Sequence, residues 1–198
     1  EPQEVLERAK KLVNKTAKVQ VKKLDGLRGS ELLKELDVLH KQGIEFIEPS
    51  DLSGALRGRH NIYTHMETIV KGAKKSVSIM TSSKGLVRKV ESMKGVLQSL
   101  AKKGVEIKIA APIDKDCSEV AKDLMSFSKV RHVDKINARF CVVDNKEIMF
   151  MVTDDKEVHP SYDIGIWVNT PFFANALGNM FEISWKSMKD ANTKLKNL

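Results

Sequence analysis

The sequence is poor in cysteine, in aromatic residues and in long apolar runs. Cys117 and Cys141 are the two cysteines in 198 residues, and they show no CxxC or Cys/His spacing, which argues against a disulfide framework or a zinc site. Reduced cysteines favour a cytoplasmic location. No uncharged apolar run approaches the roughly 18 residues that a membrane-spanning helix requires. The chain starts at Glu1 rather than at methionine, so we expect that a preceding segment was removed or left out.

The remaining composition is that of an ordinary folded protein, with 41% apolar and 30% charged residues. The motifs GxxxxGK[ST], GxGxxG, HExxH and GxSxG are missing, and the five histidines have no metal-ligand spacing. The sequence therefore predicts no cofactor and no metal site.

The net charge of +8 is concentrated in the middle of the chain. Residues 60–135 hold 15 Lys and Arg against 8 Asp and Glu. Few aromatic residues accompany these charges and only 7 of the 34 basic residues are arginine, so base stacking and bidentate base reading are weakly supported. We interpret the excess as solvated lysines on helix surfaces, including Lys71, Lys74, Lys75, Lys89, Lys102 and Lys103.

Residues 1–48 are predicted to form a helical arm in two pieces. Apolar residues recur at intervals of three and four, and the segment from Asp25 to Gly29 interrupts them before Ser30, which could cap a second helix that ends at Gly43. A narrow leucine stripe of this kind can pack on the chain's own core or form a coiled coil between two protomers. We favour a homodimer formed through the arm.

Residues 49–198 are predicted to form an α/β sandwich with a mixed sheet. A strand, a helix and a strand follow one another between residues 76 and 110, which is the spacing of a parallel βαβ unit. Asp144-Asn145-Lys146 is a hairpin turn signal between two further strands. The predicted helices lie at 60–75, 85–102, 117–127 and from 171 onward, and the predicted strands at 76–80, 105–110, 130–133, 138–143, 147–152 and 164–168. A short β-like run at 44–47 precedes this domain.

The strand and hairpin around residue 140 resemble the HxKxxxxD segment of the phospholipase D superfamily. Asn137 stands in the histidine position, Arg139 in the lysine position, and Asp144 matches the aspartate. In those enzymes an imidazole attacks phosphorus, which a carboxamide cannot do. The resemblance therefore implies a polar pocket without the chemistry. The alternative is that Arg139 pairs with a nearby carboxylate such as Asp144.

The order of segments along nearly the whole chain resembles the effector-binding part of archaeal TrmB-type transcriptional regulators. The segments that carry the resemblance are the helical arm, LRGRHNIYTHMETIVKGAKKSVSIMTSS, KGVEIKIAAP, NARFCVVDNKEIMF and YDIGIWVNTPFFANALGNMFEISWKS. The resemblance implies a phospholipase D-like domain that binds a small-molecule effector, often a sugar. It also implies DNA binding through an N-terminal winged helix that lies outside this sequence.

We predict a ligand site where loops leave the carboxyl ends of the parallel strands. Its hydroxyl, amide and carboxylate groups could bind a polyol, and an indole could stack on it. Ser82 and Ser83 could instead cap the next helix, and Trp167 could belong to the core. The predicted ligand-binding residues are Ser82, Ser83, Asn137, Arg139, Thr153, Asp154 and Trp167.

The sequence thus predicts a non-enzymatic, effector-sensing dimer that is not associated with a membrane. Two alternatives stay open at this point. One is a phosphodiesterase or nuclease whose half-sites are completed across a dimer. The other is a DNA-associated structural dimer without an effector, in which the basic middle segment touches phosphates.

Overall fold

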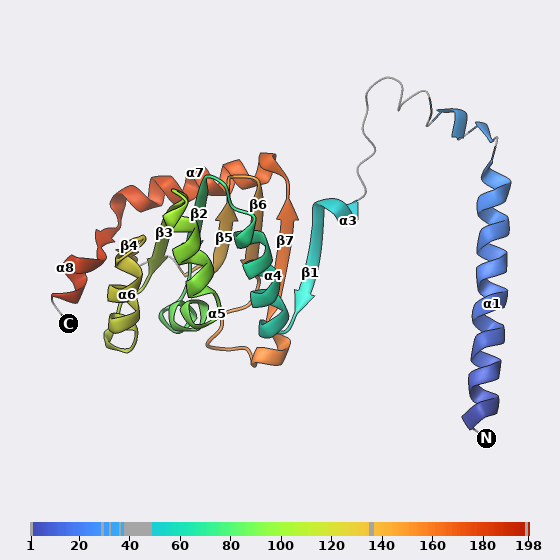
Figure 1. Cartoon of the computed structure of the whole chain (residues 1–198), viewed down its shortest axis with the longest axis horizontal. Helices are drawn as coiled ribbons and strands as arrows, with labels where there is room; N and C mark the ends of the chain where they lie inside the picture. The colour runs from blue at the N-terminus through green and yellow to red at the C-terminus, as the bar shows by residue number, and fades with distance from the viewer. Residues whose placement is uncertain are drawn as a thin grey trace. The chain divides into compact units, whose positions relative to one another are not determined.

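The computed structural model describes residues 2–28, 30–31, 33–35, 37, 49–134, 137–196 and 198. The chain divides into two units, Glu1–Ile47 and Glu48–Leu198 (Figure 1).

The main described element of the first unit is the long helix α1 (Pro2–Leu27), in which no residue is buried. Its apolar side chains recur along the helix and stand in solvent. Val5, Leu12, Val13 and Leu24 are each 66–67% exposed. The helix ends at Leu27, where the sequence predicts a break. An apolar stripe that is solvent-exposed in the protomer is suited to pairing with another helix.

The second unit is built on one eight-stranded mixed sheet with the order β1-β7-β6-β5-β2-β3-β4-β8. Strands β2, β3 and β4 run parallel to one another, and all other neighbours are antiparallel. The strands are β1 (Ser53–Arg57), β2 (Ser76–Met80), β3 (Glu106–Ala111), β4 (Lys129–His132), β5 (Phe140–Val143), β6 (Glu147–Met151), β7 (Ile164–Asn169) and β8 (Lys189–Asp190).

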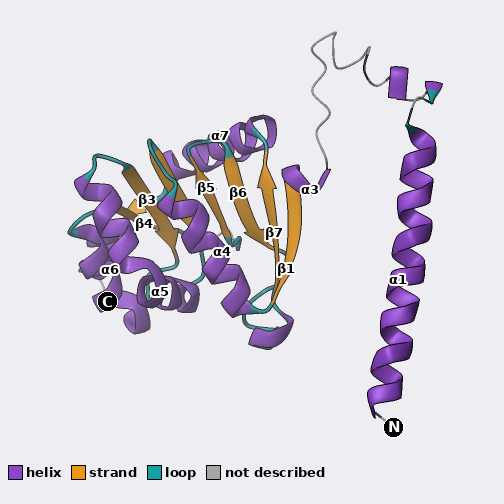
Figure 2. Cartoon of the chain, turned by 45° about the vertical axis from the view of Figure 1, so that its right-hand side comes forward, coloured by secondary structure: helices purple, strands orange, loops and turns teal. Residues whose placement is uncertain are grey.

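Helices cover both faces of this sheet (Figures 1 and 2). One face carries α4 (Arg59–Lys71), α5 (Ser83–Lys102) and α6 (Ser118–Met125), and the other carries α7 (Pro171–Ser187). Short helices lie at α3 (Pro49–Leu52), η1 (Lys115–Cys117), η2 (Pro160–Tyr162) and α8 (Ala191–Leu195). Among the described helices, none combines the length and the apolar character needed to cross a bilayer.

The central strands are buried on both faces, so alternate residues serve two different cores. Cys141 and Val143 of β5 face the α4–α5–α6 side, whereas Phe140 and Val142 face α7. All four residues of β5 are therefore buried. A strand of this kind reads as a continuous apolar run, as the sequence FCVV does.

The predicted mixed-sheet α/β fold is confirmed, and the predicted βαβ unit corresponds to β2, α5 and β3. The sequence analysis missed β1, whose residues SGALR lack β-branched side chains and are mostly exposed. Backbone pairing with β7 makes this segment a strand. The strand predicted at 44–47 lies outside the described residues, as does most of the predicted helix that ends at Gly43.

Candidate functional site

The hairpin between β5 and β6 turns at Asp144 and Asn145, both of which have positive φ angles, 53° and 52°. The Asp144 carboxylate accepts hydrogen bonds from the backbone N–H groups of Lys74, Lys75 and Ser76 at 2.8, 2.7 and 2.8 Å. Burial alone would raise the pKa of Asp144, but these three bonds hold it below the ordinary value. The alternative that Arg139 pairs with a carboxylate is confirmed, but Asp144 is not the partner, because this carboxylate binds the backbone before β2.

Arg139 pairs instead with Asp163, the residue that precedes β7. Both side chains are buried, and Nη1 and Nη2 of Arg139 lie 3.2 and 2.8 Å from the two carboxylate oxygens. Arg59, at the start of α4, approaches the same carboxylate with Nε at 3.0 Å. Burial alone would raise the pKa of Asp163, but the two guanidinium groups lower it below its ordinary value. The buried ion pair thus holds the Arg139 side chain in place within the fold.

Thr153, Asn137 and Asp154 extend this polar cluster toward the surface. The Thr153 hydroxyl donates to Asp163 at 3.0 Å, and its carbonyl oxygen accepts a hydrogen bond from Arg139. The exposed Asn137 donates from Nδ2 to Asp154 Oδ2 at 2.9 Å. Four of the predicted site residues, Asn137, Arg139, Thr153 and Asp154, therefore lie in one neighbourhood.

Ser82 and Ser83 lie at the start of α5. The Ser82 hydroxyl accepts from the N–H of Gly85 at 2.9 Å, so it caps the helix, and it donates to the buried carboxylate of Asp155 at 2.7 Å. Arg88 pairs with the same carboxylate. Ser83 instead forms a hydrogen bond with Asp114. Burial alone would raise the pKa of Asp114, but hydrogen bonds from Ser83 and Cys117 help to hold it below its ordinary value.

Lys89 is buried, which corrects its assignment to a solvated helix surface. Its ammonium group donates to Thr81 Oγ1 at 2.9 Å and lies 5.1 Å from the centre of the Tyr63 ring. Burial lowers the pKa of Lys89 to about 7, and the positive charges of Arg139 and Arg88 act in the same direction. Burial also raises the pKa of the neighbouring Cys141 thiol to about 12. The helical period does carry a signal for this, because Lys89 lies three residues after Leu86 and four before Met93, on the buried face of α5.

Trp167 belongs to the opposite face of the sheet from α7. Its ring packs edge-on against His65 of α4, with centroids 5.3 Å apart, and its Nε1 donates to Glu147 at 3.2 Å. It packs against the larger core. Its ring contact and hydrogen bond are thus made with His65 and Glu147 rather than with Asn137 or Arg139.

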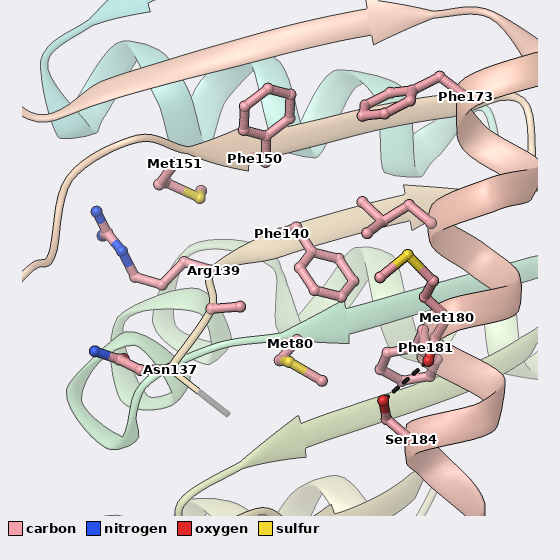
Figure 3. Close-up of a pocket in the computed structure, with 12 residues that line it drawn as sticks. Met80, Asn137, Arg139, Phe140, Phe150, Met151, Phe173, Met180, Phe181 and Ser184 are labelled. Atoms are coloured by element: carbon pink, nitrogen blue, oxygen red, sulfur yellow. Dashed lines mark hydrogen bonds between the residues drawn. The ribbon is translucent and has the colours of Figure 1, made fainter. Parts of the chain in front are cut away.

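A groove of about 480 Å³ opens between the sheet and α7, next to Asn137 and Arg139 (Figure 3). Figure 3 shows the polar ends of Asn137 and Arg139 directed away from the rings of Phe140 and Phe181. The walls are largely apolar, in contrast to the polar pocket that the sequence analysis predicts. The residues that line the groove are Met80, Asn137, Ala138, Arg139, Phe140, Phe150, Met151, Phe173, Leu177, Met180, Phe181 and Ser184.

This geometry suits binding of a partly apolar molecule, since small-molecule sites are mostly apolar concavities of about 300–1,000 Å³ with a few polar groups. Within the described residues, no group of three or more His, Cys, Asp and Glu side chains is arranged to hold a metal ion. Sequence reasoning missed four residues of this region: Asp163, Asp155, Arg88 and Lys89. Asp163 binds the predicted residue Arg139, and Asp155 binds the predicted residue Ser82, in each case from a distant part of the sequence.

Comparison with known proteins gives structural likeness without sequence relatives: no family model and no curated protein matches the sequence. TrmBL2, an archaeal chromatin protein whose structure shows a novel mode of DNA binding, is 14% identical, with a TM-score of 0.57 over 90% of this chain and 69% of that chain. NucT from Helicobacter pylori is 13% identical, with a TM-score of 0.56 over 70% of this chain and 98% of its own. Nuc from Salmonella typhimurium, a phospholipase D family member, is 16% identical, with a TM-score of 0.55 over 70% and 97%.

These likenesses establish a phospholipase D-like fold and correct one prediction. The sequence analysis concludes that the chain is not an enzyme, and the likeness to NucT and to a phospholipase D family member contradicts that conclusion. The fold is one that enzymes and a DNA-binding chromatin protein share.

Proposed function

We propose that this chain is the ligand-sensing and dimerising part of a DNA-associated regulator of the TrmB type. The observation that carries the proposal is the groove between the sheet and α7, which begins at Asn137 and Arg139, the positions that the sequence analysis singled out. The likeness to TrmBL2 supports the association with DNA. Cytoplasmic location follows as part of the same proposal.

The composition of the groove refines the class of ligand. A sugar is the effector that the family resemblance implies, but Phe140, Phe150 and Met180 offer no hydrogen bonds to its hydroxyl groups. Hydroxyls buried against such walls would lose their hydrogen bonds to water at a cost of about 1–3 kcal/mol each. A fitting ligand therefore carries an apolar part for the walls and a polar end that stays in solvent at the mouth of the groove.

The buried ion pairs suit a site that must hold its shape. Asp163 ties Arg139 to Arg59, so the start of β5, the start of β7 and the start of α4 are fixed to one another. In a dimer formed through α1, a ligand that prefers one arrangement of the two protomers would shift the population toward it. The DNA-binding segment would respond to that shift.

Differential scanning fluorimetry against sugars, organic acids and amphipathic metabolites tests the proposal. A ligand that binds the folded state raises the melting temperature. The groove-filling variant Leu177→Trp should lose the shift, whereas Asn175→Trp, on the exposed side of the same helix, should keep it. Equal shifts in both variants would contradict the groove as the site. A panel without any shift would count against sensing.

A further inference from the structure

Five exposed lysines gather at one edge of the sheet, far along the strands from the groove mouth. Two precede β2, two end α5 just before β3, and one lies in the hairpin between β5 and β6. Because β5, β2 and β3 are neighbours in the sheet, these segments are adjacent at that edge. It is the end toward which β5 and β7 point in Figure 1. The five residues, here called the lysine edge, are Lys74, Lys75, Lys102, Lys103 and Lys146.

Backbone hydrogen bonds hold the central part of the lysine edge together. The N–H groups of Lys74 and Lys75 donate to Asp144 in the hairpin, and the Lys75 carbonyl accepts from the N–H of Glu106 at 2.9 Å. The hairpin and the first residues of β2 and β3 are thus one connected structure. The spacing of the lysine backbones is set by the sheet rather than by a flexible loop.

The lysine edge carries an excess of positive charge, with five lysines beside the two carboxylates of Asp144 and Glu147. Within the described part of the chain, none of its five ammonium groups forms a salt bridge. Two carboxylates, Asp144 and Glu147, lie beside these lysines and offset part of their charge. Glu106 pairs with Lys108 and Lys129.

Helix electrostatics explains only part of this cluster. Lys102 and Lys103 lie at the carboxyl end of α5, where cations are favoured by the helix dipole. The helix dipole does not account for Lys74, Lys75 and Lys146, because these residues lie outside the helices. Five unpaired cations on one edge repel one another, and a polyanion removes that repulsion.

We propose that the lysine edge binds the phosphate backbone of duplex DNA without reading its sequence. Lysine ammonium groups are point charges that contact phosphates, and the edge presents no arginine fork or aromatic ring for bases. The lysine edge extends from the start of β6 across β5 and β2 to β3, and these three strand spacings cover about 15 Å. Over that length one strand of B-form DNA presents about four phosphates. The chain would then touch DNA directly, in addition to any winged helix outside this sequence.

Salt-dependent binding to a 30-base-pair duplex, followed by fluorescence anisotropy at several KCl concentrations, tests this inference. The matched variants are Lys74→Gln/Lys75→Gln/Lys146→Gln at the lysine edge and Lys84→Gln/Lys115→Gln/Lys156→Gln at the opposite edge, which follows β2, β3 and β6. Both triple variants remove three charges. Each phosphate contact contributes about 0.9 to the slope of log K against log[salt], so the lysine-edge variant should lose about 2.7 from that slope.

The control variant should keep the wild-type slope, and the melting temperatures should show that both variants fold. Equal losses in the two variants would overturn the inference, because net charge alone would then account for binding. So would the absence of wild-type binding at 50 mM KCl, or binding to anionic phosphatidylglycerol vesicles without binding to DNA. Leu177→Trp should bind DNA like the wild type, which separates this test from that of the groove.

Discussion

Arg139 and Asp163 form a buried, two-bond ion pair that joins the segment before β5 to the segment before β7. They are 24 residues apart, and both lie at the edge of the sheet where the predicted site residues meet. In the HxKxxxxD segment that the sequence resembles, Arg139 stands in the lysine position. Here Arg139 shares the Asp163 carboxylate with Arg59, and the adjoining groove is lined largely by apolar side chains.

Breaking this pair should strongly destabilise the fold. Arg139→Met removes the main partner of a buried carboxylate, and urea unfolding should show a loss of about 3 kcal/mol in the free energy of unfolding. Asp163→Leu should cost a similar amount, because it leaves two guanidinium groups unpaired. In the double variant the losses should not add, since the two residues act through one interaction. Additive losses would contradict the pairing.

The pH dependence of stability should carry the signature of Lys89. Its pKa is about 7 in the folded protein and 10.5 when unperturbed, so the unfolded state binds more protons between these values. The free energy of unfolding should therefore rise from pH 7.5 to 9.5, by up to about 1.4 kcal/mol per pH unit from this group. Lys89→Met should lack that rise, and Lys84→Met, which replaces an exposed lysine of the same helix, should retain it. Identical pH slopes in all three proteins would show that the pKa of Lys89 is not lowered in the folded protein.

The exposed stripe of α1 should determine the oligomeric state. Leu12→Glu/Val19→Glu places two carboxylates on a face of α1 that is exposed among the described residues. Sedimentation equilibrium should then report a monomer where the wild type is a dimer. Lys11→Glu/Lys18→Glu introduces the same residues beside the stripe and should leave the dimer in place. A monomeric wild type would refute dimerisation through the arm.

Periodicity in the sequence predicted most of the elements of the second unit, because its helices and strands bury continuous apolar faces. The central strands 76–80, 138–143 and 147–152 were expected within a few residues of β2, β5 and β6. Strand β1 was not predicted, because this segment becomes a strand through pairing with β7, more than 100 residues away. Periodicity within a short window carries no information about such a partner.

The sequence analysis predicted a polar pocket around Asn137 and Arg139, whereas the adjoining groove is largely apolar. Asn137 and Arg139 do border a groove, yet Met80, Phe140 and Phe150 give it apolar walls. The sequence analysis did not assign these residues to a site, because alternation along a strand does not show which part of a sheet face a helix leaves uncovered. The partners of Arg139 were also beyond prediction, since Asp163 and Arg59 come from segments that the hairpin motif does not include.

Methyl NMR of protein labelled at methionine Cε tests the central claim, that the groove beside Asn137 holds a small molecule, most directly. The probe is 8-anilinonaphthalene-1-sulfonate, which combines apolar rings with one anionic group. Titration should shift the methyl signals of Met80, Met151 and Met180, which line the groove, and leave those of Met66 and Met93 of the other core unchanged. Leu177→Trp should abolish these shifts. Unchanged groove methyls at saturating probe, or shifts that persist in Leu177→Trp, would contradict the account.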